Sequence, residues 1–152
     1  MAGLLVQVNV SNGGMPKLPV GAARISRDGV AGDWQKNRKY HGGPDQAICL
    51  FSQEMYDWLR DEHGIDLKAG SVGENFTTSG IDMQAVGPGD RLRVGDCLIE
   101  ITMVRTPCRN LDQWDKRLMG LMKGRSGWKA KVVEEGTVRP GDPIEYLTKQ
   151  GG

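Results

Sequence analysis

Apolar and polar residues largely alternate along several short stretches of the chain, and this spacing predicts β-strands. Leu4–Val10 is the first such stretch. Arg91–Val94 and Cys97–Val104 flank a Gly95-Asp96 pair and predict a hairpin, because Gly-Asp supplies the positive φ that a tight turn between strands needs. The other predicted strands are Gln46–Phe51, Gly127–Val133 and Ile144–Leu147.

Two segments have helical spacing instead. Ser52 is a predicted N-cap, because its hydroxyl can accept a hydrogen bond from the free amides of the turn that follows. The helix after it carries its apolar residues on one side and ends at Gly64. A second helix is predicted over Leu111–Met122, where Asn110 can serve as the cap.

The glycine content indicates how these elements connect. With 22 glycines the chain favours many tight turns, and Gly29–Gly43 and Gly70–Gly80 are predicted to be irregular loops. Because short strands outnumber helices, we expect a mainly β fold with a few helices (α+β). A closed or partly closed β-barrel with helices covering its openings is the most economical arrangement, since closure removes exposed strand edges. The 152 residues are predicted to form a single domain over 1–152.

Charge and cysteine content narrow the class of protein. The formal net charge is +1, so nothing in the overall charge attracts nucleic acid or an anionic membrane. No apolar run approaches the roughly 18 residues that span a bilayer, and Met1–Val10 lacks the pattern of a signal peptide. Three widely spaced cysteines argue against a disulfide framework and for a reducing compartment. We expect a cytoplasmic protein with neither nucleic acid nor membrane as a partner.

Cys108 carries the strongest indication of chemistry. It follows Thr106-Pro107 where a predicted strand has ended, stands just before the second predicted helix, and has Arg105 and Arg109 as basic neighbours. Positive charge and a helix N-terminus both favour the thiolate, which is the nucleophilic and metal-binding form of cysteine. The alternative is a small buried residue at a strand end. We expect Cys97, which opens a predicted strand, and Cys49, which lies inside an apolar stretch, to be packing residues.

Five further side chains are candidates for binding. In the turn that runs from His41 to Asp45, His41 could donate to a phosphate and Asp45 could accept from a ligand N–H, or the segment could be a plain turn. Asn75 offers a donor and an acceptor that suit the edge of a heterocycle, and equally suit a turn. Arg125 and Ser126 could hold a phosphate. With Cys108, the His41 and Asp45 side chains could also form a cysteine-hydrolase triad.

An ordered set of short motifs resembles a known family. The motifs are Gly29-Val30-Ala31-Gly32-Asp33, His41-Gly42-Gly43-Pro44-Asp45-Gln46-Ala47, Gly73-Glu74-Asn75-Phe76-Thr77-Thr78, Gly89-Asp90, Thr106-Pro107-Cys108 and Gly124-Arg125-Ser126-Gly127-Trp128. Over about Leu4 to Tyr146 the chain resembles the MOSC domain, which is named after the C-terminal domain of molybdenum cofactor sulfurase, and it looks most like the compact bacterial MOSC proteins. The resemblance implies a β-rich, barrel-like fold with a cysteine beside a site for the molybdenum cofactor, molybdopterin.

The resemblance also implies roles for particular residues. Cys108 matches a cysteine of the family. In relatives that reduce N-hydroxylated substrates, this cysteine resembles a ligand of the metal. In the sulfurase it has been viewed as an acceptor of sulfur. Asp45, Asn75 and Thr106 match positions that line the cofactor in the amidoxime-reducing relatives. A thiolate suits a soft, redox-active metal such as molybdenum. The predicted cofactor-binding residues are therefore His41, Asp45, Asn75, Arg105, Thr106, Arg125 and Ser126, with Cys108 as the metal ligand and catalytic residue.

The chain departs from the larger relatives in ways that affect these expectations. The amidoxime-reducing relatives hold the cofactor's phosphate on an additional N-terminal β-barrel domain, so here we expect phosphate binding by Arg38, Lys39, Arg105, Arg125 or a partner. The sulfurase has an aminotransferase-like domain with pyridoxal phosphate, and this sequence provides no pyridoxal phosphate site of its own. No electron-transfer module is expected either, so a reductase would need a separate flavin or iron–sulfur electron donor.

Two functions remain open at this point. The first is a molybdenum-dependent reductase of N-hydroxylated compounds, in which Cys108 holds the metal and outside electrons complete the turnover. The second is a carrier of the cofactor, or of sulfur as a Cys108 persulfide, with a cysteine desulfurase or a molybdoenzyme client as its partner. Whether the protein is itself an enzyme follows from this choice.

Overall fold

Short strands make up most of the regular structure in the computed structural model, which describes residues 2–33 and 43–147. The strands are β1 (Ala2–Val10), β2 (Leu18–Val20), β3 (Ala23–Ser26), β4 (Gly29–Val30), β5 (Ile48–Ser52), β6 (Phe76–Ser79), β7 (Arg91–Val94), β8 (Cys97–Val104), β9 (Trp128–Glu134), β10 (Gly136–Val138) and β11 (Pro143–Leu147). The helices are α2 (Gln53–His63), α3 (Leu118–Leu121) and the 3₁₀ turns η1 (Pro44–Gln46) and η2 (Arg109–Gln113).

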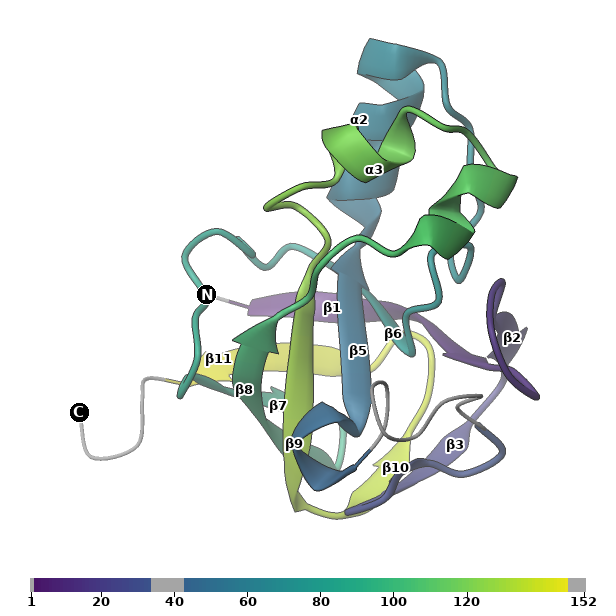
Figure 1. Cartoon of the computed structure of the whole chain (residues 1–152). Coiled ribbons are helices and arrows are strands. Elements are labelled where there is room, and N and C mark those ends of the chain that lie inside the picture. The colour runs from purple at the N-terminus through teal and green to yellow at the C-terminus, as the bar shows by residue number, and fades with distance from the viewer. Residues whose placement is uncertain (1, 34–42, 148–152) are drawn as a thin grey trace.

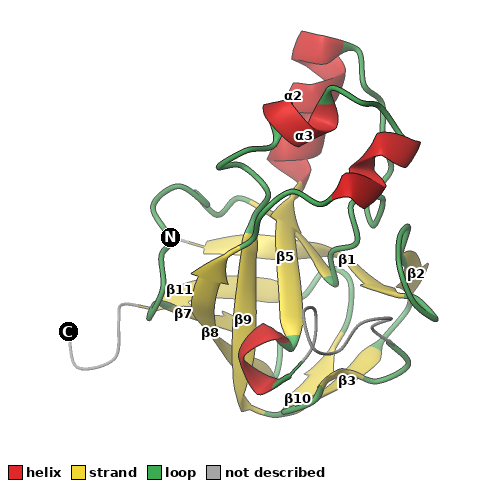
Figure 2. Cartoon of the chain, in the orientation of Figure 1, coloured by secondary structure: helices red, strands yellow, loops and turns green. Residues whose placement is uncertain are grey.

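The main sheet closes on itself as a barrel. Its eight strands follow the order β11-β7-β8-β9-β5-β6-β1-β2, and all except β2 form a ring because β1 also pairs with β11. β10, β3 and β4 form a separate three-stranded sheet. Figure 1 and Figure 2 show α2 and α3 together at one end of the barrel. The predicted closed barrel with a few helices is confirmed.

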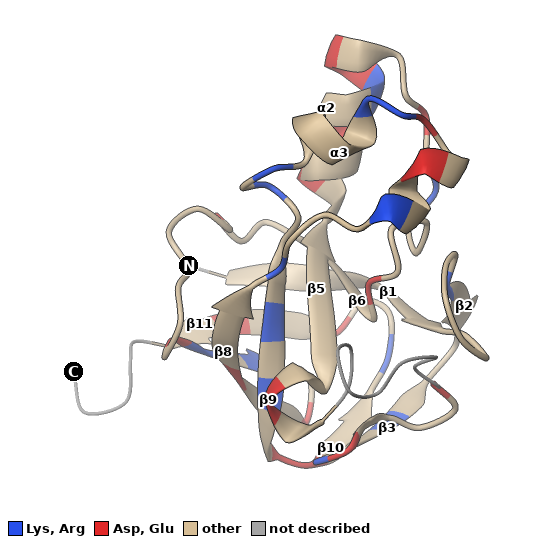
Figure 3. Ribbon diagram, viewed as in Figure 1, with Lys and Arg blue, Asp and Glu red and all other residues tan. Residues whose placement is uncertain are grey.

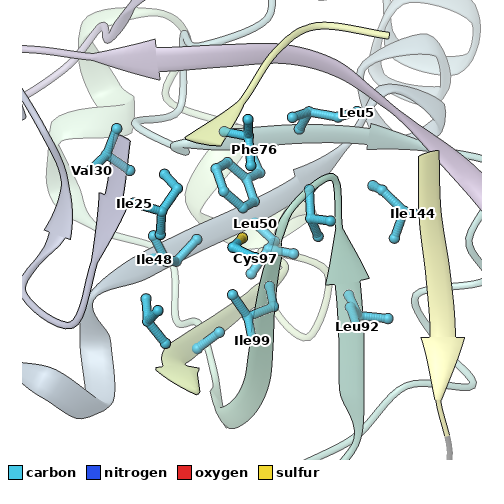
Figure 4. Packing of buried hydrophobic residues seen from close by; sticks show 14 of the residues in the cluster. Leu5, Ile25, Val30, Ile48, Leu50, Phe76, Leu92, Cys97, Ile99 and Ile144 are labelled. Atoms are coloured by element: carbon cyan, nitrogen blue, oxygen red, sulfur yellow. The ribbon is translucent and has the colours of Figure 1, made fainter. Parts of the chain in front are cut away.

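Two hydrophobic clusters stabilise these layers. The first fills the barrel, where side chains from facing strands meet (Figure 4), with Leu5, Phe76 and Leu92 fully buried. The second packs α2, η2 and α3 around Phe51 and Tyr56, whose rings meet edge to face at 4.8 Å. Each fully buried large apolar side chain contributes roughly 1.5–3 kcal/mol, so both clusters hold their elements firmly in place.

The predicted ends of the first helix are confirmed in atomic detail. Ser52 Oγ accepts a hydrogen bond from the backbone N–H of Met55 at 3.1 Å, and Gly64 ends the helix in the left-handed conformation with φ 67°. Glycine takes that conformation without the steric cost that a Cβ would bring. The predicted hairpin is also present, with β7 and β8 paired in antiparallel register.

The second predicted helix is wrong in its extent and its cap. Instead of one helix over Leu111–Met122, the structure has the short η2 and α3, and Cys108 rather than Asn110 is the N-cap of η2. Asp115 gives a physical reason, because its carboxylate accepts a hydrogen bond from the backbone N–H of Arg117 at 2.8 Å. This local bond offers the backbone an alternative to continued helix.

Two predicted loops contain strands. β4 lies at the start of the expected loop Gly29–Gly43, and β6 lies within the expected loop Gly70–Gly80. β6 pairs with β5 in parallel and with β1 in antiparallel register. These partners are distant in sequence, so the pairing rather than local periodicity makes this segment a strand. No helix among the described residues is both long enough and apolar enough to cross a bilayer.

Candidate functional site

Cys108 lies where β8 has ended and η2 begins. Its backbone is extended, with φ −120° and ψ 150°, and its Sγ accepts a hydrogen bond from the backbone N–H of Asn110 at 3.3 Å. The side chain is partly exposed, whereas Cys49 and Cys97 are buried. An N–H group directed at sulfur stabilises negative charge there. Cys108 is thus the partly exposed one of the three cysteines.

Arg105 lies three residues before Cys108 and is held by the loop that precedes β6. Its backbone N–H donates to Gly127 O at 3.0 Å, and its Nη2 donates to Val72 O. Its Nη1 is buried and has no hydrogen-bond partner among residues 2–33 and 43–147. Because buried guanidinium donors are normally satisfied, this atom indicates a position where an anion would complete the set of hydrogen bonds.

Lys129 is a basic residue of this neighbourhood that was not among the residues predicted from the sequence. It lies opposite Cys49 in the β5–β9 register, and its Nζ donates to Gln46 Oε1 at 2.6 Å. Burial lowers the pKa of the Lys129 amine, the Cys49 and Cys108 thiols oppose that shift, and the Arg105 guanidinium adds to it. The Lys129 amine is therefore close enough to both the Arg105 guanidinium and the Cys108 thiol to be influenced by each electrostatically.

The pattern of β9 explains why Lys129 is not a candidate from sequence alone. Trp128 and Ala130 pack against the barrel core, so the lysine between them has the outward position that alternation gives it. Outward lysines on a strand are ordinarily solvated, and Figure 3 shows further basic residues along β9. Local sequence offers no signal that this one is half-buried beside a cysteine on the neighbouring strand.

Asn75 is fully buried, and internal partners occupy its side chain. Its Oδ1 accepts from the backbone N–H of Cys49 at 2.9 Å, and its Nδ2 donates to Asp33 Oδ2 at 2.9 Å and to Asn9 O at 3.3 Å. The Asp33 carboxylate also forms a buried ion pair with Lys17, with 2.7 Å between Oδ2 and Nζ. The structure thus gives Asn75 a role in joining β1, β5 and β6, and its predicted contact with a cofactor remains a prediction.

No hydrogen bond or ion pair among the described residues joins Arg125 or Ser126 to Cys108. Ser126 is buried, and its Oγ donates to Met122 O at 2.8 Å. The Arg125 guanidinium stacks over the Trp58 ring, 4.4 Å from the ring centre. Arg125 also lines a groove of about 540 Å³ between α2 and the segment 80–84, whose lining includes none of the other predicted site residues. Phosphate binding by this pair stays a prediction.

The remaining predicted residues lie on the surface or outside the described residues. Asp45 is exposed in η1, where its backbone carbonyl accepts from Thr102 Oγ1. Thr106 is exposed between β8 and Cys108, where no regular element holds it. His41 lies outside the described residues, as do Arg38 and Lys39, so the structure gives these predictions no test.

The described residues include one partly exposed cysteine, Cys108, but no cluster of side chains that could bind a metal ion by itself. No group of three or more His, Cys, Asp or Glu side chains among them could hold a metal ion. Burial raises the pKa of the Cys97 thiol to about 12, which keeps it protonated inside the barrel. The arrangement fits a soft metal that brings most of its own ligands and an anionic group, with Cys108, Arg105 and Lys129 as the protein's contribution.

Comparison with known proteins agrees with this fold. The MOSC domain profile matches residues 37–145. The chain is 33% identical over 136 residues to the protein YiiM of Escherichia coli, covering 85% of this chain and 61% of the relative. It is 30% identical over 144 residues to the uncharacterized protein YflK of Bacillus subtilis, covering 92% and 65%. The chain thus spans less than two thirds of the length of these relatives.

Solved structures show the same architecture. YiiM from Geobacillus stearothermophilus superposes with a TM-score of 0.81 at 25% identity, over 99% of this chain and 77% of that protein. The YuaD protein from Bacillus subtilis, at 16% identity, shares the fold with a TM-score of 0.82 over 99% and 98% of the two chains. The profile match, the YiiM and YflK similarities and the barrel together establish that the chain belongs to the MOSC domain family.

Proposed function

We propose that this MOSC domain binds the molybdenum cofactor, with Cys108 as the protein ligand to the metal. The observation that carries the proposal is the partly exposed Cys108 three residues after Arg105, whose buried Nη1 has no partner among the described residues. A thiolate is a suitable ligand for a soft metal, and an unsatisfied guanidinium suits an anionic oxygen. In chemistry, the thiolate matches the metal of the cofactor and the guanidinium matches its phosphate.

Each residue has a distinct task in this proposal. Cys108 binds the metal through Sγ, and the Asn110 N–H helps to hold the negative charge on that sulfur. Arg105 and Lys129 bind and orient the anionic oxygens of the ligand, and the Val72 carbonyl keeps the guanidinium in place. When bound, the cofactor supplies a metal that can change oxidation state.

We further propose that the loaded protein reduces N-hydroxylated compounds. The support is the family membership together with similarity to a Gibberella moniliformis protein named "Reductase", which is 31% identical over 137 residues, although the match covers only 24% of that protein. A separate flavin or iron–sulfur protein would supply the electrons. Loaded protein with a viologen donor should reduce hydroxylaminopurine; no reduction by protein with confirmed molybdenum rejects this activity.

A carrier function is the second candidate, favoured by the partial exposure of Cys108. In this case Cys108 would hold sulfur as a persulfide, received from a cysteine desulfurase and passed to a molybdoenzyme client. Mass spectrometry after incubation with a desulfurase and cysteine should show added sulfur on the Cys108 peptide. An unmodified peptide would reject the carrier function.

Cofactor binding itself is tested by metal analysis. Wild-type protein, Cys108→Ser and Cys97→Ala are purified from a host replete in the cofactor, and molybdenum and oxidised-pterin fluorescence are measured. We expect molybdenum in the wild type and in Cys97→Ala, which removes a thiol inside the barrel, and its loss in Cys108→Ser. Equal molybdenum in the Cys108→Ser variant, or none in the wild type, would contradict the assignment.

A further inference from the structure

Basic residues gather in the segment 105–129, which contains Cys108. This segment has seven Lys or Arg and two Asp, a net charge of +5, whereas the whole chain carries +1. Figure 3 shows the basic positions at the start of η2, before α3, between α3 and β9 and on β9. The rest of the chain therefore has a net charge of −4, and the positive charge of the protein is concentrated in this one region.

The η2 and α3 part of the segment presents its charges to solvent because its apolar residues point inward. The second hydrophobic cluster buries three of its side chains, Leu111, Leu118 and Met122. Around them the basic residues Arg109, Lys116 and Lys123 are exposed. None of these three forms an ion pair with an acid of residues 2–33 and 43–147. They are therefore available to carboxylates of another molecule without loss of an internal pair.

Two exposed apolar side chains flank Cys108 within this basic region. Val104 ends β8 and is 48% exposed, and Trp114 lies at the end of η2 and is 37% exposed. Four residues separate Val104 from Cys108 by at most about 14 Å, and a 3₁₀ turn places Trp114 about 12 Å away. The Trp114 ring is held by a hydrogen bond from its Nε1 to Ser71 O at 2.9 Å. Exposed aromatic and aliphatic groups inside a charged rim are typical of a surface that binds another protein.

We propose that a small acidic electron-transfer protein docks on this surface, formed by Val104, Arg109, Trp114, Lys116 and Lys123. The proposal rests on the proposed function, because a metal held at Cys108 needs electrons from outside and a donor that comes close to it. Carboxylates of the partner pair with the three cations, and the two apolar side chains exclude water at the centre. A small contact of this mixed kind is typical of transient electron-transfer complexes, in which charge guides the encounter.

A nucleic acid is the other molecule that a basic surface attracts. Its binding depends mainly on the number of phosphates that the protein neutralises. The three exposed cations are few for that purpose, and the chain as a whole carries only +1. The apolar pair Val104 and Trp114 also has no task against a phosphate backbone, so the surface fits an acidic protein better.

The test measures binding of an acidic flavodoxin to the full chain, purified from a host replete in the cofactor, by isothermal titration calorimetry. The ionic strength is kept at about 0.01 M, where exposed charges are little screened. The double variant Lys116→Gln/Lys123→Gln removes two cations of the surface and should raise the dissociation constant about tenfold. Circular dichroism confirms that each variant is folded.

A matched control removes two exposed cations elsewhere. Arg27 and Arg139 lie in turns beside β3 and β10, at the other end of the molecule from α3 (Figure 1). The double variant Arg27→Gln/Arg139→Gln has the same net charge as the first one. It should change the dissociation constant less than about twofold, because charges far from the contact act weakly.

Salt and an apolar variant separate the two parts of the contact. At about 0.15 M ionic strength, screening should reduce the effect of Lys116→Gln/Lys123→Gln to about threefold. Val104→Ser should weaken binding about threefold at both ionic strengths, because an apolar contact is not screened by salt. An effect of Val104→Ser that disappears at the higher ionic strength would contradict an apolar centre.

Three results would overturn the docking surface. They are absence of flavodoxin binding by the wild type at low ionic strength, equal weakening by the two double variants, and tighter binding of a short DNA duplex than of flavodoxin. Molybdenum is measured on the same samples. Flavodoxin binding without molybdenum would reject the proposed function alone, and molybdenum without flavodoxin binding would reject the docking surface alone.

Discussion

Replacement of Asn75 by alanine distinguishes a structural amide from a ligand-binding one. The side chain makes three internal hydrogen bonds, to the Cys49 N–H, to the Asp33 carboxylate and to the Asn9 carbonyl. Alanine removes all three bonds. It also leaves the buried Cys49 N–H without the side-chain acceptor, in a strand of the barrel wall that is buried along its whole length.

The expected cost follows from these contacts. Three bonds at about 1 kcal/mol each, together with about 1–2 kcal/mol for an unsatisfied buried N–H, give a loss of about 4–5 kcal/mol. That is a large part of the roughly 5–15 kcal/mol by which a folded domain is usually stable. Urea unfolding followed by circular dichroism measures the loss.

A control and a refuting result complete this prediction. Asn110→Ala changes an exposed asparagine and should alter the free energy of unfolding by less than about 0.5 kcal/mol. The structural argument would be refuted if Asn75→Ala lowered the free energy of unfolding by less than about 1 kcal/mol and left the dependence of that free energy on urea concentration unchanged. Weakened molybdenum retention in such a stable variant would instead support the predicted cofactor contact.

Three further predictions concern reactivity, packing and pH. At about pH 8, iodoacetamide should label Cys108 and spare Cys97, whose pKa of about 12 leaves it protonated; labelling of native Cys97 contradicts this. At Gly127, where φ is 86°, the Cβ of an alanine would clash with the Leu50 carbonyl oxygen, whereas at Gly141, where φ is 93°, it would meet open space. Gly127→Ala should therefore lower the free energy of unfolding by about 2 kcal/mol more than Gly141→Ala. Equal melting temperatures for the two variants would refute this prediction. Because burial raises the pKa of Glu74 above 4.5, the folded state keeps this proton to higher pH than the unfolded chain. This contribution to stability is complete below the unfolded pKa of Glu74 and is lost as pH rises through the folded pKa. The stability of the wild type relative to Glu74→Gln, measured by urea unfolding, should therefore decline as pH rises. An increase with pH would reject this prediction.

Local sequence patterns determined much of the fold. The alternation of β1, β8 and β9, the Ser52 cap, the Gly64 end of α2 and the β7–β8 hairpin all depend on residues close together in the chain. Such features follow from backbone geometry and capping, which act over a few residues. The motif set likewise indicates the MOSC family by itself, since those motifs lie in a fixed order along the chain.

Tertiary structure alone decided what the polar residues do. Asn75 bonds the Cys49 amide 26 residues away and the Asn9 carbonyl 66 residues away, and Lys129 meets Gln46 from 83 residues away. The register between strands brings these partners together, and no local pattern encodes that register. The sequence therefore determined strands such as β1, β8 and β9 and the first helix, and it singled out Cys108 as a candidate. Only the closed barrel showed that the Asn75 side chain forms hydrogen bonds within the protein and that Lys129 lies near Cys108 and Arg105. The reason is that the partners of a buried polar group are set by how the whole chain packs.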